Sequence, residues 1–509
     1  MIVLHMSDFI TGFTIFFFSL LIVNWYKSKT RKYPYPPGPP ASRIPIIGNI
    51  LQMPSKGAWY VFRDWAKDYG DLIFLHGLGN RVLVVNNLDL AAELFEKQWS
   101  VFSNRPTFTV AGELMGLQST VFSLMNYGHE WRERRKLINL ALNTRAIQKY
   151  RSLQEDIAAL LNRDLLVDPE HFFEHLYLAS GRVVLSVTYG IFAENVENQY
   201  IDDAERCMDA IGKALSPGAY LADIIPPLKY LPSFVPFQKE AQSAKRLIQR
   251  NAERPYFLVK KWLSEGTAPE SLAKDLLLSG NEGPEFEHRA MWVTSTMYGA
   301  GAETTFAASV TFILAMAMHQ DVQKAAQEEI DRVVGKDKIP TIEDVSRLPY
   351  TMAVIKETLR WHPPVPLSLP RCTAEDSIFN GYFIPKNTVV LPNLWAISRS
   401  VIKPDQFNPE RFMNEGPALE DSIPDPFEWV FGLGRRICPG QHLAKNSLIA
   451  MITSILSAFD IAPLDGQDTV PNFTTANIIS HPEKFKCMIR PRSQQKKEVI
   501  ETRARDVKF

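Results

Sequence analysis

The sequence predicts a mainly helical protein with small β-sheets, and three observations along the chain support this class. Between Tyr150 and Pro284 the pattern of apolar residues is mainly helical. From Met291 to His319 there is no proline and most residues are apolar, which predicts one long buried helix. The β-like runs 72–75 and 81–85 are short, and the glycines between them favour a hairpin.

The composition narrows the class of protein. Of the 509 residues, 46% are hydrophobic and 11% are aromatic, so the chain can bury a large core. Length alone suggests roughly three domains of ~150 residues. The 56 Lys and Arg balance the 56 Asp and Glu, so no overall field favours nucleic acid as a partner. The four cysteines lack C-x-x-C spacing, which excludes a disulfide framework and a zinc site and favours a reducing compartment.

An almost wholly apolar run extends from Phe9 to Tyr26. At about 18 residues and ~1.5 Å rise per residue, it nearly spans a ~30 Å hydrocarbon core. Basic residues follow it at once, which places the N-terminus outside or in a lumen and the remaining chain in the cytosol. A cleaved signal peptide is the alternative, but its positive charge would precede the apolar run and small residues would follow it. Residues 1–32 are therefore expected to form a transmembrane helix with a basic flank, in contact with a lipid bilayer.

Residues 33–40 read YPYPPGPP. Proline fixes φ and removes backbone donors, so this stretch cannot be helical and should form a stiff, extended spacer. A ligand for a proline-recognising partner is the alternative. Because the stretch directly follows an anchor, we interpret it as a hinge that orients a domain formed by residues 41–509.

The most informative stretch, FGLGRRICPG, runs from Phe431 to Gly440. A cysteine that binds a metal as a thiolate needs donors nearby in a tight loop. Gly434 can adopt a positive φ, which leaves backbone N–H groups free to point at the sulfur of Cys438. Gly440 lets the following helix approach closely, and Arg436 supplies a cation for the edge of an anionic cofactor. The alternative is a glycine-rich turn around a buried, inert cysteine.

The spacing F-x-x-G-x-R-x-C-x-G resembles the haem-binding loop of the cytochrome P450 family, and in particular of microsomal, fungal-type members. The resemblance covers nearly the whole chain. It implies the cytochrome P450 fold and heme b as cofactor, with Cys438 as the thiolate ligand of the iron and with Phe431, Gly432 and Arg436 beside the cofactor. Because the motifs are far apart in sequence yet must converge on one haem, we expect residues 41–509 to form one domain.

Two further cofactor contacts rest on the same resemblance. Trp131 and Arg135 are separated by four residues in a predicted helix, so they share a face that can offer an indole N–H and a guanidinium to a carboxylate. This W-x-x-x-R pair resembles one that holds a haem propionate, and Arg371 matches another propionate-binding position. The alternative for the helix is a simple basic surface, and we expect Arg132, Arg134 and Lys136 to form a solvated basic patch.

The middle of the predicted long helix reads GAGAETT, from Gly299 to Thr305. Two glycines inside a helix cost roughly 1 kcal/mol each relative to alanine, so a compensating role is expected. Small side chains permit close approach by a flat cofactor, or alternatively a close crossing of two helices. The stretch resembles the oxygen-activation segment of the family, which implies that Glu303 and Thr304 are catalytic and deliver protons to oxygen.

The remaining predictions concern structure. P-E-R-F at 409–412 resembles a family segment in which Arg411 joins Glu357 and Arg360 in a buried triad. Residues 103–126 are expected to be an irregular, apolar loop. The chain from Arg490 onward is expected to be a frayed tail.

The resemblance implies a monooxygenase that inserts one atom of O2 into a lipophilic small molecule, a secondary metabolite or a xenobiotic. Apolar residues after Ser103, in 217–237 and in 367–369 suggest that the substrate is lipophilic.

No G-x-G-x-x-G unit is present, so NADPH–cytochrome P450 reductase is the implied electron donor, with cytochrome b5 as an optional second one. The reductase would bind to a basic face that includes Arg134, Arg435 and Lys445. The implied location is the endoplasmic reticulum membrane. A haem-thiolate isomerase or dehydratase and a non-catalytic haem-binding protein are the alternatives, and Glu303 with Thr304 argues against both.

Overall fold

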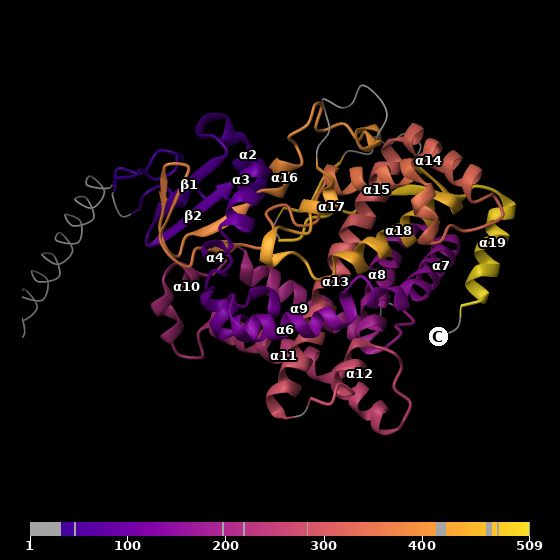
Figure 1. Cartoon of the computed structure of the whole chain (residues 1–509), viewed down its shortest axis with the longest axis horizontal. Helices are drawn as coiled ribbons and strands as arrows, with labels where there is room; N and C mark the ends of the chain where they lie inside the picture. The colour runs from indigo at the N-terminus through magenta and orange to yellow at the C-terminus, as the bar shows by residue number, and fades with distance from the viewer. Residues whose placement is uncertain are drawn as a thin grey trace, which may run out of the picture.

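The computed structural model describes residues 32–44, 47–195, 198–216, 219–281, 283–413, 424–464, 471–475 and 478–507. Within these ranges the protein is mainly helical with small β-sheets, as predicted (Figure 1). The predicted N-terminal transmembrane helix lies outside the described residues.

A four-stranded sheet lies at the left-hand end of the molecule in Figure 1. Strands β1 (Leu72–Gly77) and β2 (Asn80–Val85) form the predicted hairpin, with Leu72 opposite Val85. Strand β6 (Val389–Pro392) lies parallel to β2 and antiparallel to β3 (Arg371–Cys372). Two further hairpin-like pairs are β4 (Ser377–Phe379) with β5 (Tyr382–Ile384), and β7 (Phe459–Pro463) with β8 (Cys487–Pro491).

The proline-rich segment 33–40 lies extended against strands β1 and β5. The Pro37 carbonyl accepts a hydrogen bond from the Phe74 amide, and the Pro34 carbonyl accepts one from the Phe383 amide, both at 2.7 Å. A Cβ atom on Gly38 would lie 2.2 Å from the Phe74 carbonyl oxygen, so only glycine permits this approach. The segment is therefore held on the sheet by backbone contacts.

The helices form the larger part of the molecule, and the long ones pack around α13 (Pro284–Met318). The other helices are α2 (Ala58–Tyr69), α3 (Leu88–Ala92), α4 (Trp99–Phe102), α5 (Leu117–Thr120), α6 (His129–Leu142), α7 (Arg151–Val167), α8 (Phe172–Tyr189), α9 (Gln199–Leu215), α10 (Leu221–Ile224), α11 (Pro236–Ser264), α12 (Leu272–Leu277), α14 (Gln320–Val333), α15 (Pro349–Trp361), α16 (Leu394–Ile397), α17 (Pro426–Trp429), α18 (Gln441–Ala458) and α19 (Gln494–Arg505).

Helix α13 is the predicted long central helix. It is the one helix among the described residues that is long and apolar enough to cross a membrane, but it is mostly buried and forms part of the core. Its two glycines have different surroundings. A Cβ atom on Gly301 would lie 2.8 Å from Cγ2 of Val184 in α8, whereas one on Gly299 would meet only the Met208 sulfur, at 3.6 Å. Gly301 therefore allows the close crossing of α8 and α13.

The predicted charged triad is present and buried. Arg360 donates to both carboxylate oxygens of Glu357, at 2.6 and 2.8 Å, and Nε of Arg411 lies 3.5 Å from Oε1 of the same carboxylate. None of the three residues is more than 5% exposed. The triad joins α15 to the segment Pro409–Phe412.

Two structural expectations were wrong. The chain after Arg490 is not a frayed tail, because the Ser493 hydroxyl caps α19, Ile500 is buried, and Arg503 forms an ion pair with Asp156 of α7. The segment 103–126 is not simply irregular, since it contains a π-helical turn, Thr109–Leu114, and α5.

We predict that Glu357→Gln lowers the free energy of unfolding by about 3–5 kcal/mol, because two buried guanidinium groups lose their carboxylate. Urea unfolding measures the change. The neighbouring Lys356→Gln is the control. It breaks a partly exposed pair with Asp425 (2.9 Å) and should cost less than about 1 kcal/mol. Equal losses in the two variants would contradict a special role for the buried triad.

Candidate active site

The loop around Cys438 is tight and is held by its own backbone. The Cys438 amide donates to the Phe431 carbonyl at 2.9 Å, and the Ile437 amide donates to the Gly434 carbonyl at 3.1 Å. Gly434 has the predicted positive φ, of 62°, and a Cβ atom there would lie 2.0 Å from the Phe95 carbonyl oxygen. Gly432 also has a positive φ, of 82°. Gly434 lets the loop lie against the π-helical turn Glu93–Lys97.

The Cys438 sulfur lies at the N-terminus of α18, where backbone amides point toward it. Backbone amides donate to the sulfur as expected, but they belong to Gly440 and Gln441 and were expected from the turn at Gly434; Arg135 places a positive charge nearby. Burial raises the pKa of the Cys438 thiol, while these amides and Arg135 oppose that shift. Donors at a helix N-terminus favour the thiolate over the thiol, so the loop suits a sulfur that is an anion when a cation binds it.

Three arginines with buried side chains meet beside this loop. Arg436 donates to the carbonyls of Ser103 and Met125, both at 2.7 Å, and Arg371 donates to the Leu433 carbonyl at 2.6 Å. Arg105 donates to the carbonyls at 123, 369 and 370. All three side chains are at least nine-tenths buried, and in the described part of the chain none forms an ion pair. We call Arg105, Arg371 and Arg436 the arginine cluster.

The cluster carries three positive charges and forms no ion pair among the described residues, although the nearby carboxylate of Glu96 opposes the lowering of the pKa of Arg371. Burial, together with the charges of Arg105 and Arg371, lowers the pKa of Arg436 to about 8. Burial and Arg105 likewise lower the pKa of Arg371 to about 9. One nitrogen of Arg371 and one of Arg436 are buried without a hydrogen-bond partner among the described residues. Buried charges in proteins are normally paired, so the geometry fits an anionic ligand with more than one carboxylate, such as haem.

The predicted pair Trp131 and Arg135 shares a helix face, but the two side chains have different surroundings. Nε1 of Trp131 is buried without a partner among the described residues, and the guanidinium of Arg436 lies 4.9 Å from its ring centre. Arg135 instead donates to the Ile437 carbonyl at 2.7 Å. Trp131 thus adds an unpaired donor beside the arginine cluster, and Arg135 supports the cysteine loop.

The expected basic patch on α6 needs one correction. Arg132 and Lys136 are exposed, but Arg134 is only 2% exposed. Arg134 pairs with Glu130 at 2.8 Å and donates to the Thr120 carbonyl, because its side chain faces α5 rather than solvent. Arg134 therefore belongs to the interior and cannot contact a partner protein.

Glu303 and Thr304 line a cavity of about 190 Å³, bounded by α9, α11 and α13 together with residues from the segments 121–124, 365–369 and 478–479. The Thr304 hydroxyl donates to the Ala300 carbonyl at 3.1 Å. Burial raises the pKa of Glu303 to about 7, with a contribution from the carboxylates of Asp209 and Glu205. Below this pKa the carboxyl group is protonated, so it can both give and take a proton near neutral pH.

The cavity wall follows the predictions in part. Leu369, Ile478 and Ile479 line it. Leu367 does not; it packs beside the four-stranded sheet instead. No described residue of 219–237 is part of the wall, although this segment was expected to contact substrate.

Sequence reasoning missed Arg105 and Asn251. Arg105 links the arginine cluster to the wall of the cavity through the Ser123 and Leu369 carbonyls. Its partners are main-chain oxygens far away in sequence, so no local pattern marks the residue. Asn251 opens onto the cavity from α11, a helix without a motif.

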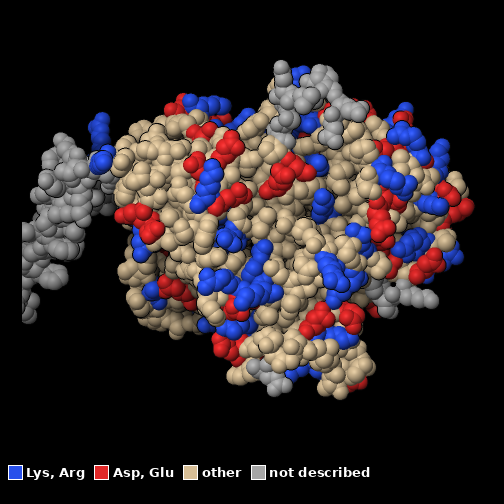
Figure 2. Space-filling model, in the orientation of Figure 1, with Lys and Arg blue, Asp and Glu red and all other residues tan. Residues whose placement is uncertain are grey.

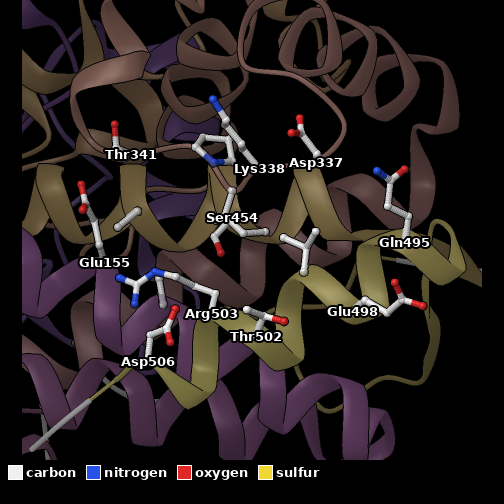
Figure 3. A pocket seen from close by; sticks show the side chains of 15 residues that line it. Glu155, Asp337, Lys338, Thr341, Ser454, Gln495, Glu498, Thr502, Arg503 and Asp506 are labelled. Atoms are coloured by element: carbon white, nitrogen blue, oxygen red, sulfur yellow. The ribbon is translucent and has the colours of Figure 1, made fainter.

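A larger cavity of about 460 Å³ lies elsewhere, between α7, α18, α19 and residues 337–341 (Figure 3). Its lining includes Glu155, Asp337, Glu498 and Asp506 as well as Arg503. None of the predicted site residues reaches it, so its size does not make it the candidate active site.

Comparison with known proteins agrees with the geometry. The profile described as "Cytochrome P450" matches residues 36–489. The chain is 36% identical to "Cytochrome P450 monooxygenase COX2" of Coprinopsis cinerea over 94% of this chain and 93% of that protein. It is 35% identical to "Cytochrome P450 monooxygenase 208" of Postia placenta, over 96% of each chain. It is 34% identical to "Cytochrome P450 monooxygenase claR" of Ampulloclitocybe clavipes, over 92% of this chain and 89% of that protein.

Proposed function

Because the chain belongs to the cytochrome P450 family and is a haem-thiolate monooxygenase, we propose that it inserts one oxygen atom of O2 into a lipophilic small molecule while anchored to the endoplasmic reticulum membrane. Electrons come from NADPH through a separate reductase. The placement of Glu303 and Thr304 in an apolar cavity supports this proposal most directly.

We assign the contacts with haem to residues of this chain. Cys438 ligates the iron, and the amides of Gly440 and Gln441 stabilise its negative charge. The arginine cluster and Nε1 of Trp131 bind the propionate groups, with Arg135 holding the loop and Phe431 and Gly432 shaping it. Haem with a thiolate ligand supplies the activation of O2 for insertion into a C–H bond.

The chain itself contributes positioning and proton transfer. The apolar wall excludes water around the substrate. Glu303 exchanges protons with the exposed carboxylates of Glu205 and Asp209, and the Thr304 hydroxyl passes a proton toward oxygen in the cavity. A pKa near 7 lets Glu303 be reloaded after each turnover.

Exposed apolar side chains support contact with a membrane. In the segment around α10, Leu221, Tyr230 and Phe234 are 67%, 81% and 70% exposed. Helix α10 and residues 32–40 both lie at the left-hand end of the molecule in Figure 1. We assign residues 1–32 to the anchor and 33–40 to the hinge. Extraction with alkaline carbonate tests the anchor, since release of the full-length chain into the supernatant would contradict it.

A basic surface supports docking of NADPH–cytochrome P450 reductase, and of cytochrome b5 as an optional donor. Lys and Arg side chains gather over α6 on the face seen in Figure 2. Exposed Arg132, Lys136 and Arg435 and the partly exposed Lys445 form the surface that we propose. Opposite charges on a partner would speed its encounter with this face.

The first prediction concerns Cys438. The purified, reduced protein treated with carbon monoxide should show the Soret band of thiolate-ligated haem, and Cys438→Ser should abolish it. Cys487→Ser is the matched control and should keep the band, because burial within the β7–β8 region raises the pKa of that thiol to about 12. Absence of the band from the wild-type protein would overturn the proposed function.

The second prediction concerns proton delivery. Positioned proton donors contribute roughly 10²–10⁴-fold to rates, so Thr304→Ala should lower product formed per NADPH by about tenfold or more. Hydrogen peroxide should rise in parallel. Thr305→Ala is the control. The Thr305 hydroxyl donates to the Gly301 carbonyl at 2.9 Å, as the Thr304 hydroxyl donates to the Ala300 carbonyl, but Thr305 does not line the cavity. Unchanged product per NADPH in Thr304→Ala would remove this role.

The third prediction concerns the electron donor. Arg435→Glu reverses one charge of the proposed docking surface and should slow reduction by the reductase several-fold at low salt, measured by stopped-flow absorbance. The band with carbon monoxide should stay intact. Lys324→Glu changes an exposed charge on α14 and should leave the rate unchanged. If Arg435→Glu and the wild type were reduced at the same rate at low salt, the reductase would bind to a different surface.

A further inference from the structure

The polar side chains that line the cavity differ in how their hydrogen bonds are satisfied. Thr296 and Thr304 donate to carbonyls of their own helix, at 2.7 and 3.1 Å. Asn251 of α11 and Ser295 of α13 also line the cavity, and they are only 7% and 9% exposed. Within the described residues, neither side chain has a hydrogen-bond partner.

The polar atoms of Asn251 and Ser295 are not among the fully buried unpaired atoms of the described residues, and both residues line the cavity, so these atoms are accessible from it. A ligand that fills the cavity without bonding to them would leave them buried and unpaired, which weakens binding. Polar groups of this kind in a binding cavity are satisfied when a ligand supplies the matching atom, and they then reject ligands that lack it. The asparagine amide and the serine hydroxyl each both donate and accept, so together they suit a hydroxyl or carbonyl oxygen.

The charged residues that line the cavity also limit the charge that a ligand can carry. No Lys, Arg or His is among the described residues that line the cavity, whereas Asp209 and Glu303 are. An anionic ligand would therefore meet carboxylates and no counter-charge, which disfavours its binding.

We propose that the substrate is a mostly apolar molecule that is not an anion and carries a hydroxyl or carbonyl oxygen, and that Asn251 and Ser295 bind this oxygen. The two residues are specificity-determining, and they fix which carbon atoms of the substrate approach Thr304. This inference rests on the proposed function for the identity of the cavity as the substrate site.

Three probes of similar size separate the effect of a hydroxyl group from that of a negative charge: naphthalene, 2-naphthol and 2-naphthoate. Their dissociation constants are measured by isothermal titration calorimetry on the full-length holoenzyme and on Asn251→Leu, Ser295→Ala and Thr296→Val. A neutral hydrogen bond contributes about 1 kcal/mol and a pair of them more. Asn251→Leu should therefore weaken 2-naphthol by about tenfold and leave naphthalene unchanged. Ser295→Ala should act in the same direction, and 2-naphthoate should bind most weakly to the wild type.

Thr296→Val is the matched control, because this threonine lines the same cavity but is already bonded, and it should not alter the preference for 2-naphthol over naphthalene. Asn251→Leu should also melt close to the wild type, since leucine has a similar volume and the side chain it replaces makes no hydrogen bond to the described residues. An unchanged preference in both Asn251→Leu and Ser295→Ala, or tightest binding of 2-naphthoate, would overturn the inference. Calorimetry does not depend on turnover, so these outcomes are distinct from a missing thiolate band, which would overturn the proposed function.

Discussion

Positive charge without a counter-charge is the constraint on which the interior depends. The fold brings Arg105, Arg371 and Arg436 together at a place where their hydrogen-bond partners among the described residues are carbonyl oxygens and none of them forms an ion pair. Carbonyls orient a guanidinium, but they do not neutralise it. The lowered pKa values of all three arginines have burial as their first cause. An anionic cofactor bound at this point, as we propose, would stabilise the fold, because it would supply the counter-charge that the buried arginines lack.

The triad of Glu357, Arg360 and Arg411 also contains buried arginines, but these are paired with a carboxylate from the chain itself. Arg360 and Arg411 are as deeply buried as the arginine cluster, but Glu357 lies between them. One group of arginines is complete within the chain and the other is not. This contrast distinguishes the structural role of the triad from the binding role that we propose for the arginine cluster, although all of these side chains look alike in sequence.

The sequence predicted the features that local spacing defines and failed where distant packing decides. Ten consecutive residues around Cys438 specify the loop, so the positive φ of Gly434 and the donation of backbone amides to the sulfur could be expected. Arg134 was expected in solvent because its neighbours are charged, yet its side chain faces α5. Arg105 and Asn251 carry no local pattern, since their importance comes from carbonyls and a cavity contributed by remote segments. The last helix was missed because its stability comes from contact with α7 rather than from its own polar composition.

The close crossing of α8 and α13 makes the side chains allowed at positions 184 and 301 depend on each other. With a Cβ on Gly301 only 2.8 Å from the Val184 methyl group, either residue can grow only if the other shrinks. Substitutions at these sites would therefore show epistasis in a deep mutational scan, with a smaller residue at 184 rescuing alanine at 301. For directed evolution, the spacing of these helices is adjustable only through paired changes, and libraries that vary one position at a time would overlook it.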